Sequence, residues 1–223
     1  LHDTAILKLD MPKKPPFVFL AGQYIDILLK DGHTRSYSLA GSPAQTEQLE
    51  LHIRKRDGGL FSGMLFGNDP LIKEKTIMRV RGPMGTFTLN EEETQPIILL
   101  ATGTGFAPIQ SILLRLIEQQ SQRQVHLYWG GRNEAELYYA EQAAELTGRL
   151  KNGRFTPVLS RADENWNGAR GYVQQQVLRD HSDLSAHQVY ACGSPAMITD
   201  AQEILAGQGR LKNDAFFSDA FSP

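Results

Sequence analysis

Residues 96–108, PIILLATGTGFAP, constrain the fold more than any other part of the chain. Residues 97–101 form a short, continuously apolar run, which is typical of a strand buried on both faces of a parallel sheet. The run ends at a glycine-rich turn, and apolar residues then recur at helical spacing from Pro108 onward. Proline is well tolerated at a helix start, because its missing N–H would have no intrahelical acceptor there. A strand, a glycine turn and a helix start together expose backbone N–H groups that can bind phosphate.

This turn alone leaves two interpretations open. Gly103, Thr104 and Gly105 could face the phosphates of a nucleotide, but Pro108 stands where the fingerprint G-x-G-x-x-G has its third glycine. Glycine pairs after strands also serve as simple tight turns. The segment therefore predicts a nucleotide site only in combination with other motifs.

Composition excludes several classes of protein. The chain has 223 residues, of which 41% are hydrophobic and 22% charged, as in ordinary globular proteins with one large or two modest domains. A net charge of -2 argues against nucleic acid or an anionic membrane as the main partner. No apolar run approaches the ~20 residues of a membrane span, and no secretory signal is visible. We predict a cytoplasmic protein.

Cysteine and histidine usage narrows the chemistry further. Cys192 is the only cysteine, so the chain forms no internal disulfide and cannot ligate an iron–sulfur cluster alone. The six histidines show no metal-ligand spacing, so no metal site is expected. The chain starts at Leu1 rather than Met, and residues 1–9 alternate like a strand already under way. We therefore expect a fragment, or a chain whose first strand is missing.

Two halves of the chain have different patterns. Short strands separated by turn signals are predicted at 4–9, 24–29, 34–40, 50–55 and 77–82, with one short helix at 61–66. Strands of this length and spacing predict a small antiparallel barrel or sandwich.

Residues 96–223 instead alternate buried strands with helical stretches. Strands are predicted at 97–101, 125–130, 156–159 and 189–192, and helices at 108–119, 134–147, 173–179 and 195–207. This order predicts a doubly wound parallel α/β sheet. The acidic, apolar-poor residues 90–95 form a natural linker, which divides the chain into domains 1–93 and 96–223.

Two segments of the first half have features of ligand sites. On a strand, Arg35 and Tyr37 share one face, where a guanidinium and a ring could bind a planar, phosphate-bearing ligand. The alternative is a half-exposed strand in which Tyr37 packs and Arg35 is solvated. Gly59 and Ser62 lie where a glycine turn enters a helix and could offer donors to a pyrophosphate, or Ser62 could be an ordinary N-cap.

Motifs spread along nearly the whole chain resemble those of one family. They occur in one order: RSYSLAGSP at 35–43, GGLFS at 58–62, GPMGTF at 82–87, ATGTGFAPI at 101–109, YWGGRNEAELYY at 128–139 and ACGSPAM at 191–197. Together they resemble the ferredoxin–NADP reductase family, in particular the reductase modules of bacterial oxygenases, CDP-6-deoxyglucoseen reductases and NAD(P)H:flavin reductases. The resemblance implies an antiparallel FAD-binding β-barrel followed by an α/β NAD(P)H-binding domain.

The resemblance implies roles on the flavin side. Arg35 would bind the flavin pyrophosphate, Tyr37 would stack on the isoalloxazine, and Ser38 would hydrogen-bond near its N5. The remaining residues implied to contact the FAD are His52, Ile53, Arg54, Gly59, Leu60 and Ser62.

The resemblance also implies roles on the nicotinamide side. Gly103, Thr104 and Gly105 would face the NAD(P)H pyrophosphate, with Pro108 opening their helix. The segment beside the nicotinamide is Cys192, Gly193, Pro195 and Met197. Cys192 could instead be an inert buried residue, and it is not expected to act as a nucleophile. Phe221 would cover the flavin face that the nicotinamide reaches, and Asp219 either assists near N5 or is a surface carboxylate.

The implied activity is hydride transfer from NAD(P)H to bound FAD, which then passes electrons to an iron–sulfur (2Fe-2S) acceptor. Because the chain has one cysteine, that acceptor is expected upstream in a longer chain or on another protein. The alternatives are a free-flavin reductase, against which the GGLFS motif argues, and a non-catalytic flavin-binding subunit, against which the 101–109 and 191–195 motifs argue.

The nucleotide preference rests on few residues. An NADPH site needs a cation for the 2′-phosphate, and Ser160 with Arg161, or Arg132, could supply it. Asp163 and Glu164 would repel that phosphate. We therefore expect NADH.

Overall fold

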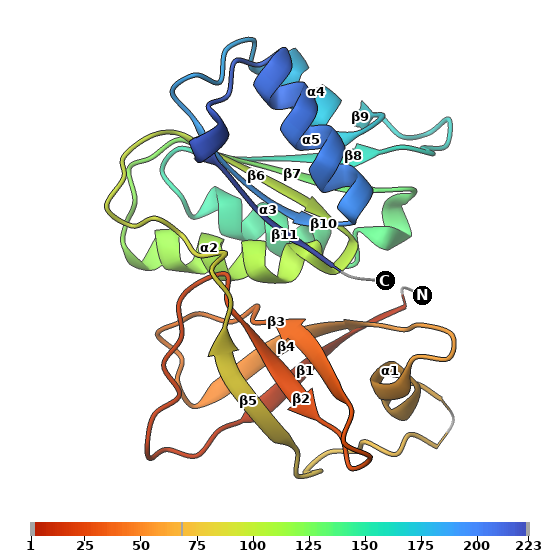
Figure 1. The fold of residues 1–223 in the computed structure, drawn as a ribbon. Coiled ribbons are helices and arrows are strands. Elements are labelled where there is room, and N and C mark those ends of the chain that lie inside the picture. The colour runs from red at the N-terminus through yellow and green to blue at the C-terminus, as the bar shows by residue number, and fades with distance from the viewer. Residues whose placement is uncertain (1–2, 68, 222–223) are drawn as a thin grey trace.

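The computed structural model describes residues 3–67 and 69–221, so Leu1 and His2 of the alternating N-terminal segment lie outside the described residues. Two halves stack on each other (Figure 1). The elements of the N-terminal half are β1 (Thr4–Asp10), β2 (Tyr24–Leu28), β3 (Thr34–Ser38), β4 (Gln48–Arg54), α1 (Leu60–Leu65) and β5 (Arg79–Met84).

The N-terminal strands are all antiparallel. β1 pairs with β4, and β2 pairs with both β3 and β5. A bridge between Leu39 and Leu51 connects these two sheets around one core, in which Ile25, Leu51 and Phe61 are fully buried. The predicted antiparallel β domain is confirmed.

The C-terminal half alternates strands and helices. Its main elements are β6 (Ile97–Thr102), α2 (Phe106–Glu118), β7 (Val125–Gly131), α3 (Ala140–Gly148), β8 (Gly153–Leu159), β9 (Ala169–Arg170), α4 (Val173–Asp180), β10 (Gln188–Gly193), α5 (Pro195–Gly207) and β11 (Phe216–Ala220). All pairs of neighbouring strands are parallel, in the order β11-β10-β6-β7-β8-β9. The predicted doubly wound parallel sheet is confirmed.

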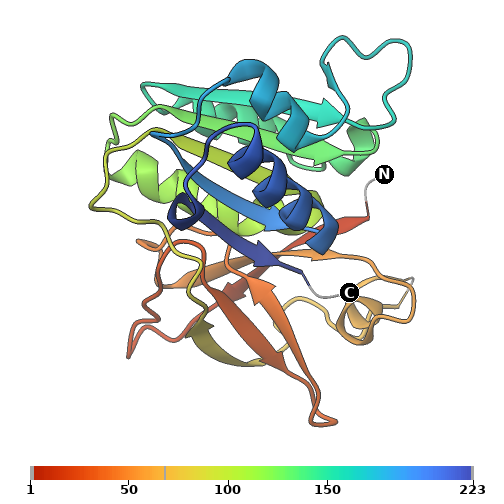
Figure 2. The same cartoon turned by 45° about the horizontal axis from the view of Figure 1, so that its top comes forward.

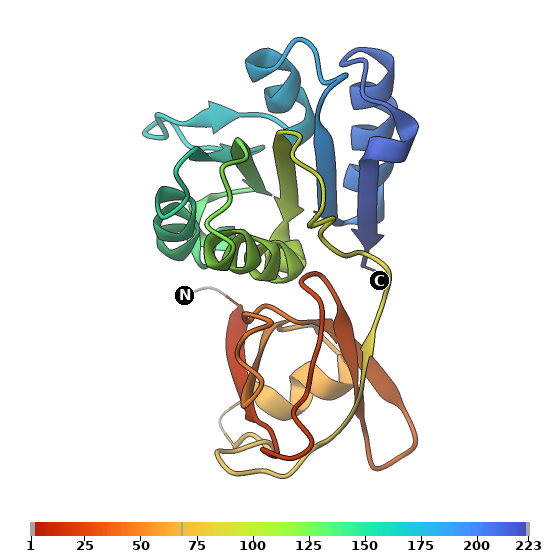
Figure 3. The ribbon, with the colours of Figure 1, turned by 90° about the vertical axis from the view of Figure 1, so that its left-hand side faces the viewer.

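Helices cover both faces of this sheet. The buried residues of α2 and α3 belong to one apolar cluster, and those of α4 and α5 belong to another. Figures 1 and 3 show that α2 lies between the parallel sheet and the N-terminal half. Figure 2 shows β11 at the sheet edge, running toward the N-terminal half.

Several predicted boundaries are wrong. The helix predicted at 134–147 is interrupted: a 3-10 turn covers Glu134–Glu136, and α3 begins only at Ala140. Leu137 between them is buried in the core, and its backbone, with φ -86 and ψ 57, is not helical. A second 3-10 turn, Gly103–Gly105, precedes α2, so the helix begins at Phe106 and Pro108 is its third residue. β9 and β11 were not predicted.

Polar contacts join the two halves. The Gln110 side-chain amide on α2 donates to Ala40 O at 3.1 Å and to Glu50 Oε1 at 2.7 Å. His52 Nδ1 lies 2.7 Å from the Tyr138 hydroxyl, and its Nε2 lies 3.1 Å from Glu50 Oε1. These contacts hold β4 against α2 and the segment before α3.

In the part of the chain that the structure describes, no helix has the length and apolarity needed to cross a membrane.

Candidate cofactor-binding cleft

A cleft of about 1390 Å³ lies between the two halves. The cleft lies at the switch point of the parallel sheet. From β6 the chain continues to β7 on one side, whereas the later strand β10 lies on the other side of β6. Ligands of open α/β sheets bind at the carboxyl ends of the strands at such a point. The volume exceeds the roughly 300–1,000 Å³ of a typical small-molecule site, so the cleft can hold more than one drug-sized ligand.

Strand β3 forms much of the N-terminal side of the cleft, and residues 34–38 all line it. The half-buried Tyr37 ring packs against Phe61 with ring centroids 5.3 Å apart. Burial raises the pKa of Tyr37, and the positive charges of Arg35 and Arg56 partly oppose this. Tyr37 therefore presents a neutral ring between two cations.

The start of α1 continues this side. Ser62 is the third residue of the helix rather than its N-cap, which is Gly59, so the N-cap interpretation of Ser62 is wrong. Ser62 Oγ accepts from the Arg56 N–H at 3.1 Å and lies 3.3 Å from Arg56 O. A Cβ at Gly59 would lie 2.4 Å from Ser62 Oγ, so a larger residue there would displace the Ser62 side chain. We call residues 34–38 and 56–62 the barrel wall.

The turn after β6 forms the opposite side. Gly103 has φ +53, a left-handed conformation that favours glycine, and its carbonyl accepts from Trp129 Nε1 at 3.1 Å. A Cβ at Gly105 would lie 2.1 Å from Cys192 O, so only glycine lets this turn pack on β10. The glycine turn at residues 103–105 thus sets how closely the ends of β6 and β10 lie beside each other.

The end of β10 completes that side. The Ser194 N–H donates to Thr102 Oγ1 at 3.2 Å, which ties the two strand ends together. Ser194 is the N-cap of α5, where its hydroxyl accepts from the Met197 N–H at 3.3 Å and Pro195 starts the helix. We call residues 102–104 and 194–197 the sheet wall.

The chain's last described residues reach the same cleft. β11 pairs with β10, and the Phe221 N–H donates to Gly193 O at 3.0 Å. Asp219, Ala220 and Phe221 line the cleft, and burial raises the pKa of Asp219. The terminal strand therefore places an aromatic ring and a carboxyl group between the two walls.

Comparisons with known proteins match this architecture. Residues 1–89 match the oxidoreductase FAD-binding domain and residues 99–203 the oxidoreductase NAD-binding domain. The chain is 45% identical over 225 residues to the CDP-6-deoxy-L-threo-D-glycero-4-hexulose-3-dehydrase reductase of Yersinia pestis. The matched region covers 100% of this chain and 65% of that protein. It is 31% identical to a probable flavin reductase of Aliivibrio fischeri, over 97% of this chain and 92% of the relative.

The chain belongs to the ferredoxin–NADP reductase family. The structure of the cytochrome P450 reductase GcoB from Amycolatopsis matches with a TM-score of 0.89 and 29% identity, over 99% of this chain and 66% of that one. The resemblance inferred from the six motifs is confirmed, as are the predicted FAD and nicotinamide cofactors. The chain spans about 65% of the length of the Yersinia reductase.

Most residues that were singled out from the sequence meet in the cleft. Those that line it are Arg35, Tyr37, Ser38, His52, Arg54, Gly59, Leu60, Ser62, Gly103, Thr104, Arg132, Ser160, Pro195, Met197 and Phe221.

Other singled-out residues do not line the cleft: Ile53, Gly105, Pro108, Arg161, Cys192 and Gly193. Ile53 and Cys192 are fully buried in apolar clusters, and Arg161 is exposed elsewhere. Burial raises the pKa of the Cys192 thiol, as expected for the inert residue that the sequence left open. Gly105 and Gly193 act on the cleft only through backbone packing.

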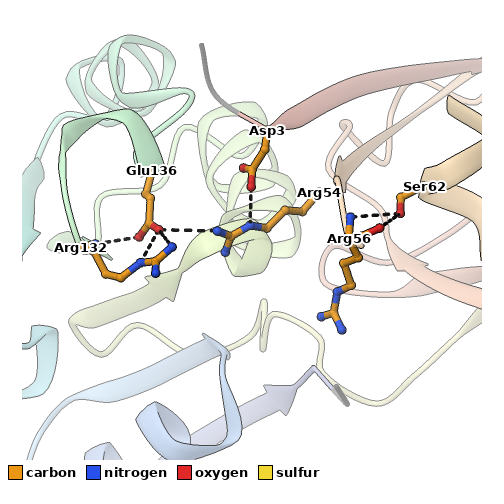
Figure 4. A network of polar contacts seen from close by, with 6 residues as sticks. All are labelled: Asp3, Arg54, Arg56, Ser62, Arg132 and Glu136. Carbon is orange, nitrogen blue, oxygen red and sulfur yellow. Dashed lines mark hydrogen bonds and ion pairs between the residues drawn. The ribbon is translucent and has the colours of Figure 1, made fainter. Parts of the chain in front are cut away.

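Charged residues that were not singled out from the sequence include Arg56 and Glu136, which line the cleft, and Asp3, which forms an ion pair with Arg54. Figure 4 shows Glu136 between Arg132 and Arg54, with Asp3 beside Arg54. Arg56 could have been found from its place two residues after Arg54, just before the GGLFS motif. Nothing in the sequence indicates the Arg54–Glu136 pair, since its members are far apart and belong to different halves.

The donors of the barrel wall fit FAD. Arg35, Arg56 and the Ser62 hydroxyl lie around a turn in which Gly58 has φ +69, a conformation that favours glycine, and Tyr37 offers a ring face. Guanidinium groups and turn N–H groups bind a pyrophosphate, and a ring stacks on a planar heterocycle.

Among residues 3–67 and 69–221, no cluster of His, Cys, Asp or Glu is arranged to hold a metal ion.

Proposed function

We propose that the chain binds FAD on the barrel wall and NAD(P)H on the sheet wall, and that hydride passes between them across the cleft. The observation that supports this most is that residues of both walls line one continuous cleft. When bound, the FAD supplies the hydride acceptor and releases electrons singly. The division into an FAD-binding unit (1–93) and a nicotinamide-binding unit (96–223) is part of this proposal.

On the barrel wall, the side chains hold and orient the flavin. Arg35 and Arg56 offset the negative charge of its pyrophosphate, and the Ser62 hydroxyl and turn N–H groups add directional hydrogen bonds. Tyr37 stacks on the ring system, supported from behind by Phe61. Ser38, buried at the end of β3, donates its hydroxyl near the flavin N5.

On the sheet wall, the backbone positions the nicotinamide nucleotide. Gly103 and Thr104 present N–H groups to its pyrophosphate, and Pro195 and Met197 lie beside the nicotinamide. Phe221 covers the flavin face until the nicotinamide takes its place. Hydride transfer needs the reacting atoms within roughly 3–3.5 Å, so the polar contacts of His52 and Gln110 that fix the two halves also fix this spacing.

The electron acceptor proposed is a 2Fe-2S domain or protein. Support comes from relatives named as the reductase components of phenol 2-monooxygenase and terephthalate 1,2-dioxygenase and from a structure named as a ferredoxin reductase in carbazole 1,9a-dioxygenase. With one cysteine, this chain cannot ligate such a cluster alone. The acceptor lies either in a longer chain that contains this one or on a separate protein. A cytoplasmic location is proposed on the same cysteine usage.

A free-flavin reductase is the alternative, supported by the similarity to the probable flavin reductase. Purification followed by measurement of flavin per chain separates the two. Bound FAD at about one per chain supports the proposal, whereas a colourless protein that reduces added riboflavin supports the alternative.

The proposed nucleotide is NADH. The guanidinium group of Arg132, one of the two candidate ligands of a 2′-phosphate, is paired with the Glu136 carboxylate. Arg161, the other candidate, does not line the cleft. We expect kcat/KM to be at least tenfold higher for NADH than for NADPH, and the reverse order would contradict this assignment.

A further inference from the structure

Three histidines that are far apart in the sequence meet in the C-terminal half, away from the cleft. His126 is the second residue of β7, His181 directly follows α4, and His187 directly precedes β10. The ring centroids of His126 and His181 lie 5.3 Å apart, and those of His181 and His187 lie 5.4 Å apart. None of the three lines the cleft. We call them the histidine cluster.

Hydrogen bonds of His126 join the cluster to the end of α4. Its Nε2 lies 2.8 Å from Thr156 Oγ1, and its Nδ1 lies 3.1 Å from His181 Nε2 and 2.8 Å from the Tyr128 hydroxyl. The Tyr128 hydroxyl donates at 2.8 Å to Oδ2 of Asp180, the last residue of α4. One buried imidazole therefore links β7, β8 and the end of α4.

The arrangement of the nitrogens fits neutral rings. Because His126 Nδ1 faces His181 Nε2, only one of these two atoms can carry a hydrogen in a hydrogen bond between them. With both rings protonated, two N–H groups would face each other. His187 Nδ1 is buried without a hydrogen-bond partner among the described residues, so an N–H there would lack an acceptor.

The surroundings of the first two rings also disfavour protonation. The pKa of His126 is lowered to about 3, first by burial and then by the charges of Arg154 and His181. Asp180 opposes this shift. Burial also lowers the pKa of His181, on which Asp180 and Arg154 act in opposite directions.

The third ring has similar surroundings. Burial lowers the pKa of His187, the charge of His181 acts in the same direction, and that of Asp183 acts against it. Asp183 itself pairs with Arg210 at 3.0 Å. The acidic groups near the cluster therefore do not offset its burial.

Helix α4 connects this cluster to the cleft. Its last residue is held by Tyr128, whereas its first two residues, Val173 and Gln174, line the cleft. The helix covers the face of the parallel sheet that points away from the N-terminal half (Figure 1). Val173 packs closely on the end of β7, because a Cβ at Gly130 would lie 2.8 Å from Val173 Cγ1. Since one short helix carries both contacts, losing the contact at Asp180 loosens the end that lines the cleft.

We propose that the histidine cluster is a pH-sensitive latch on α4: neutral rings hold the helix on β7, and protonation releases it and weakens nucleotide binding in the cleft. The effect on the nucleotide rests on the proposed function. Release exposes the rings to water, where the pKa of histidine is about 6.5. Each ring that is neutral when latched and solvated when released then shifts the equilibrium toward release by up to about tenfold per pH unit below 6.5.

Hydrogen exchange of the α4 backbone amides tests the latch without any nucleotide. Exchange rates of the purified protein at pH 7.5 and pH 5.5, each corrected for the intrinsic effect of pH, give the protection of each helix. The protection of α4 should fall at least tenfold at pH 5.5, and that of α3, on the other face of the sheet, less than threefold. An equal fall in both helices would overturn the latch, as would no fall in α4.

Variants test whether the imidazoles cause this fall. In the double variant His126→Gln/His181→Gln, which keeps polar groups that do not titrate, the protection of α4 should change less than threefold between the two pH values. His33→Gln, in the exposed turn between β2 and β3, is the matched control and should retain the full fall. If the double variant does not fold, His181→Gln alone, at a half-buried position, should reduce the fall at least threefold. An unchanged fall in the folded variant would overturn the role of the cluster.

Calorimetry with ADP-ribose, which has the adenine and diphosphate of NADH but no nicotinamide, tests the coupling to the cleft. Its dissociation constant should rise at least threefold from pH 7.5 to pH 5.5 in the unaltered protein, and less than twofold in the double variant. The same rise in both proteins would overturn the coupling. Failure of the proposed function would appear differently, as absence of bound FAD and of ADP-ribose binding already at pH 7.5.

Discussion

The two walls of the cleft are built from different kinds of group. The barrel wall presents side chains, with the charges of Arg35 and Arg56 and the ring of Tyr37. The sheet wall presents mainly backbone, with the Gly103 turn and the N-cap of α5 at Ser194. On the proposed function, one wall would recognise its ligand by charge and stacking, and the other by the shape of tight turns.

This difference predicts how each wall responds to substitution. A side chain on the barrel wall can be removed with the fold intact, because Arg35 and Tyr37 are only partly buried. On the sheet wall, adding a single methyl group to a glycine should disturb the packing of two strand ends. Substitutions can therefore separate loss of flavin from loss of the nucleotide site.

Gly105→Ala should have the largest effect. The added Cβ would lie 2.1 Å from Cys192 O and 2.9 Å from Gly193 Cα, where no flexible side chain can yield. We expect the unfolding free energy to fall by about 3 kcal/mol or more, with loss of flavin reduction by NADH. Thermal unfolding and flavin absorbance measure both.

Gly148→Ala is the matched control, because nothing lies within 4 Å of a Cβ at that last residue of α3. It should leave NADH-dependent reduction unchanged. Equal losses in both glycine variants would show that glycine shape at the sheet wall is not what matters.

Arg35→Ala should come next and should act on flavin rather than on the fold. Removing a charge that binds phosphate costs about 1.5–3 kcal/mol, so FAD should bind roughly 10- to 100-fold more weakly. Arg79→Ala, on the exposed part of β5, is the control. Fluorescence titration of the flavin-free protein with FAD compares them, and equal affinities would contradict a side-chain-based barrel wall.

Tyr37 tests the stacking contribution. Tyr37→Ala should weaken FAD binding by about 1 kcal/mol, since it removes an aromatic contact, whereas Tyr37→Phe should retain nearly all affinity. The same FAD titration measures both. If Tyr37→Phe were as weak as Tyr37→Ala, the hydroxyl rather than the ring face would be the contact.

The contact between the two halves should depend on pH. Burial lowers the pKa of His52 below 6.5, although Glu50 partly opposes this. As pH falls through 6.5, His52 therefore binds a proton in the unfolded chain but stays neutral in the folded chain. Stability is then lost at up to about 1.4 kcal/mol per pH unit.

Burial by itself would raise the pKa of Glu50. The hydrogen bonds with His52 and Gln110 outweigh this effect, so the pKa lies below 4.5. Stability from Glu50 is therefore present above pH 4.5 and is lost as pH falls through its folded pKa. His52→Gln should reduce the slope of the unfolding free energy against pH between pH 6.5 and 5, by up to the amount that corresponds to one bound proton. Chemical denaturation across this range measures the slope, and an unchanged slope would contradict a neutral buried His52.

The architecture was predictable because its signals are local. Alternating short strands in the first half, and apolar runs followed by helical periods in the second, each require only neighbouring residues to recognise. The break at Leu137 was missed because a helical pattern continues through it, and only the backbone conformation of the folded chain reveals the interruption. β11 was missed because its strand form depends on pairing with β10.

The cleft was predictable only in part, for the same reason. Motif residues such as Arg35, Tyr37 and Gly103 could be singled out because each lies within a recognisable stretch. The family resemblance implied that Arg54 contacts the flavin, whereas its position beside Gly103 and Glu136 depends on how the two halves meet. Ion pairs between distant segments leave no sequence pattern that could predict them.

Anaerobic rapid mixing of the FAD-loaded protein with NADH tests the central proposal most directly, namely that the two walls bring a nicotinamide and a flavin together in one cleft. We predict that the flavin absorbance at about 450 nm bleaches in a single turnover without any added acceptor. Persistence of that absorbance with NADH bound would contradict the account.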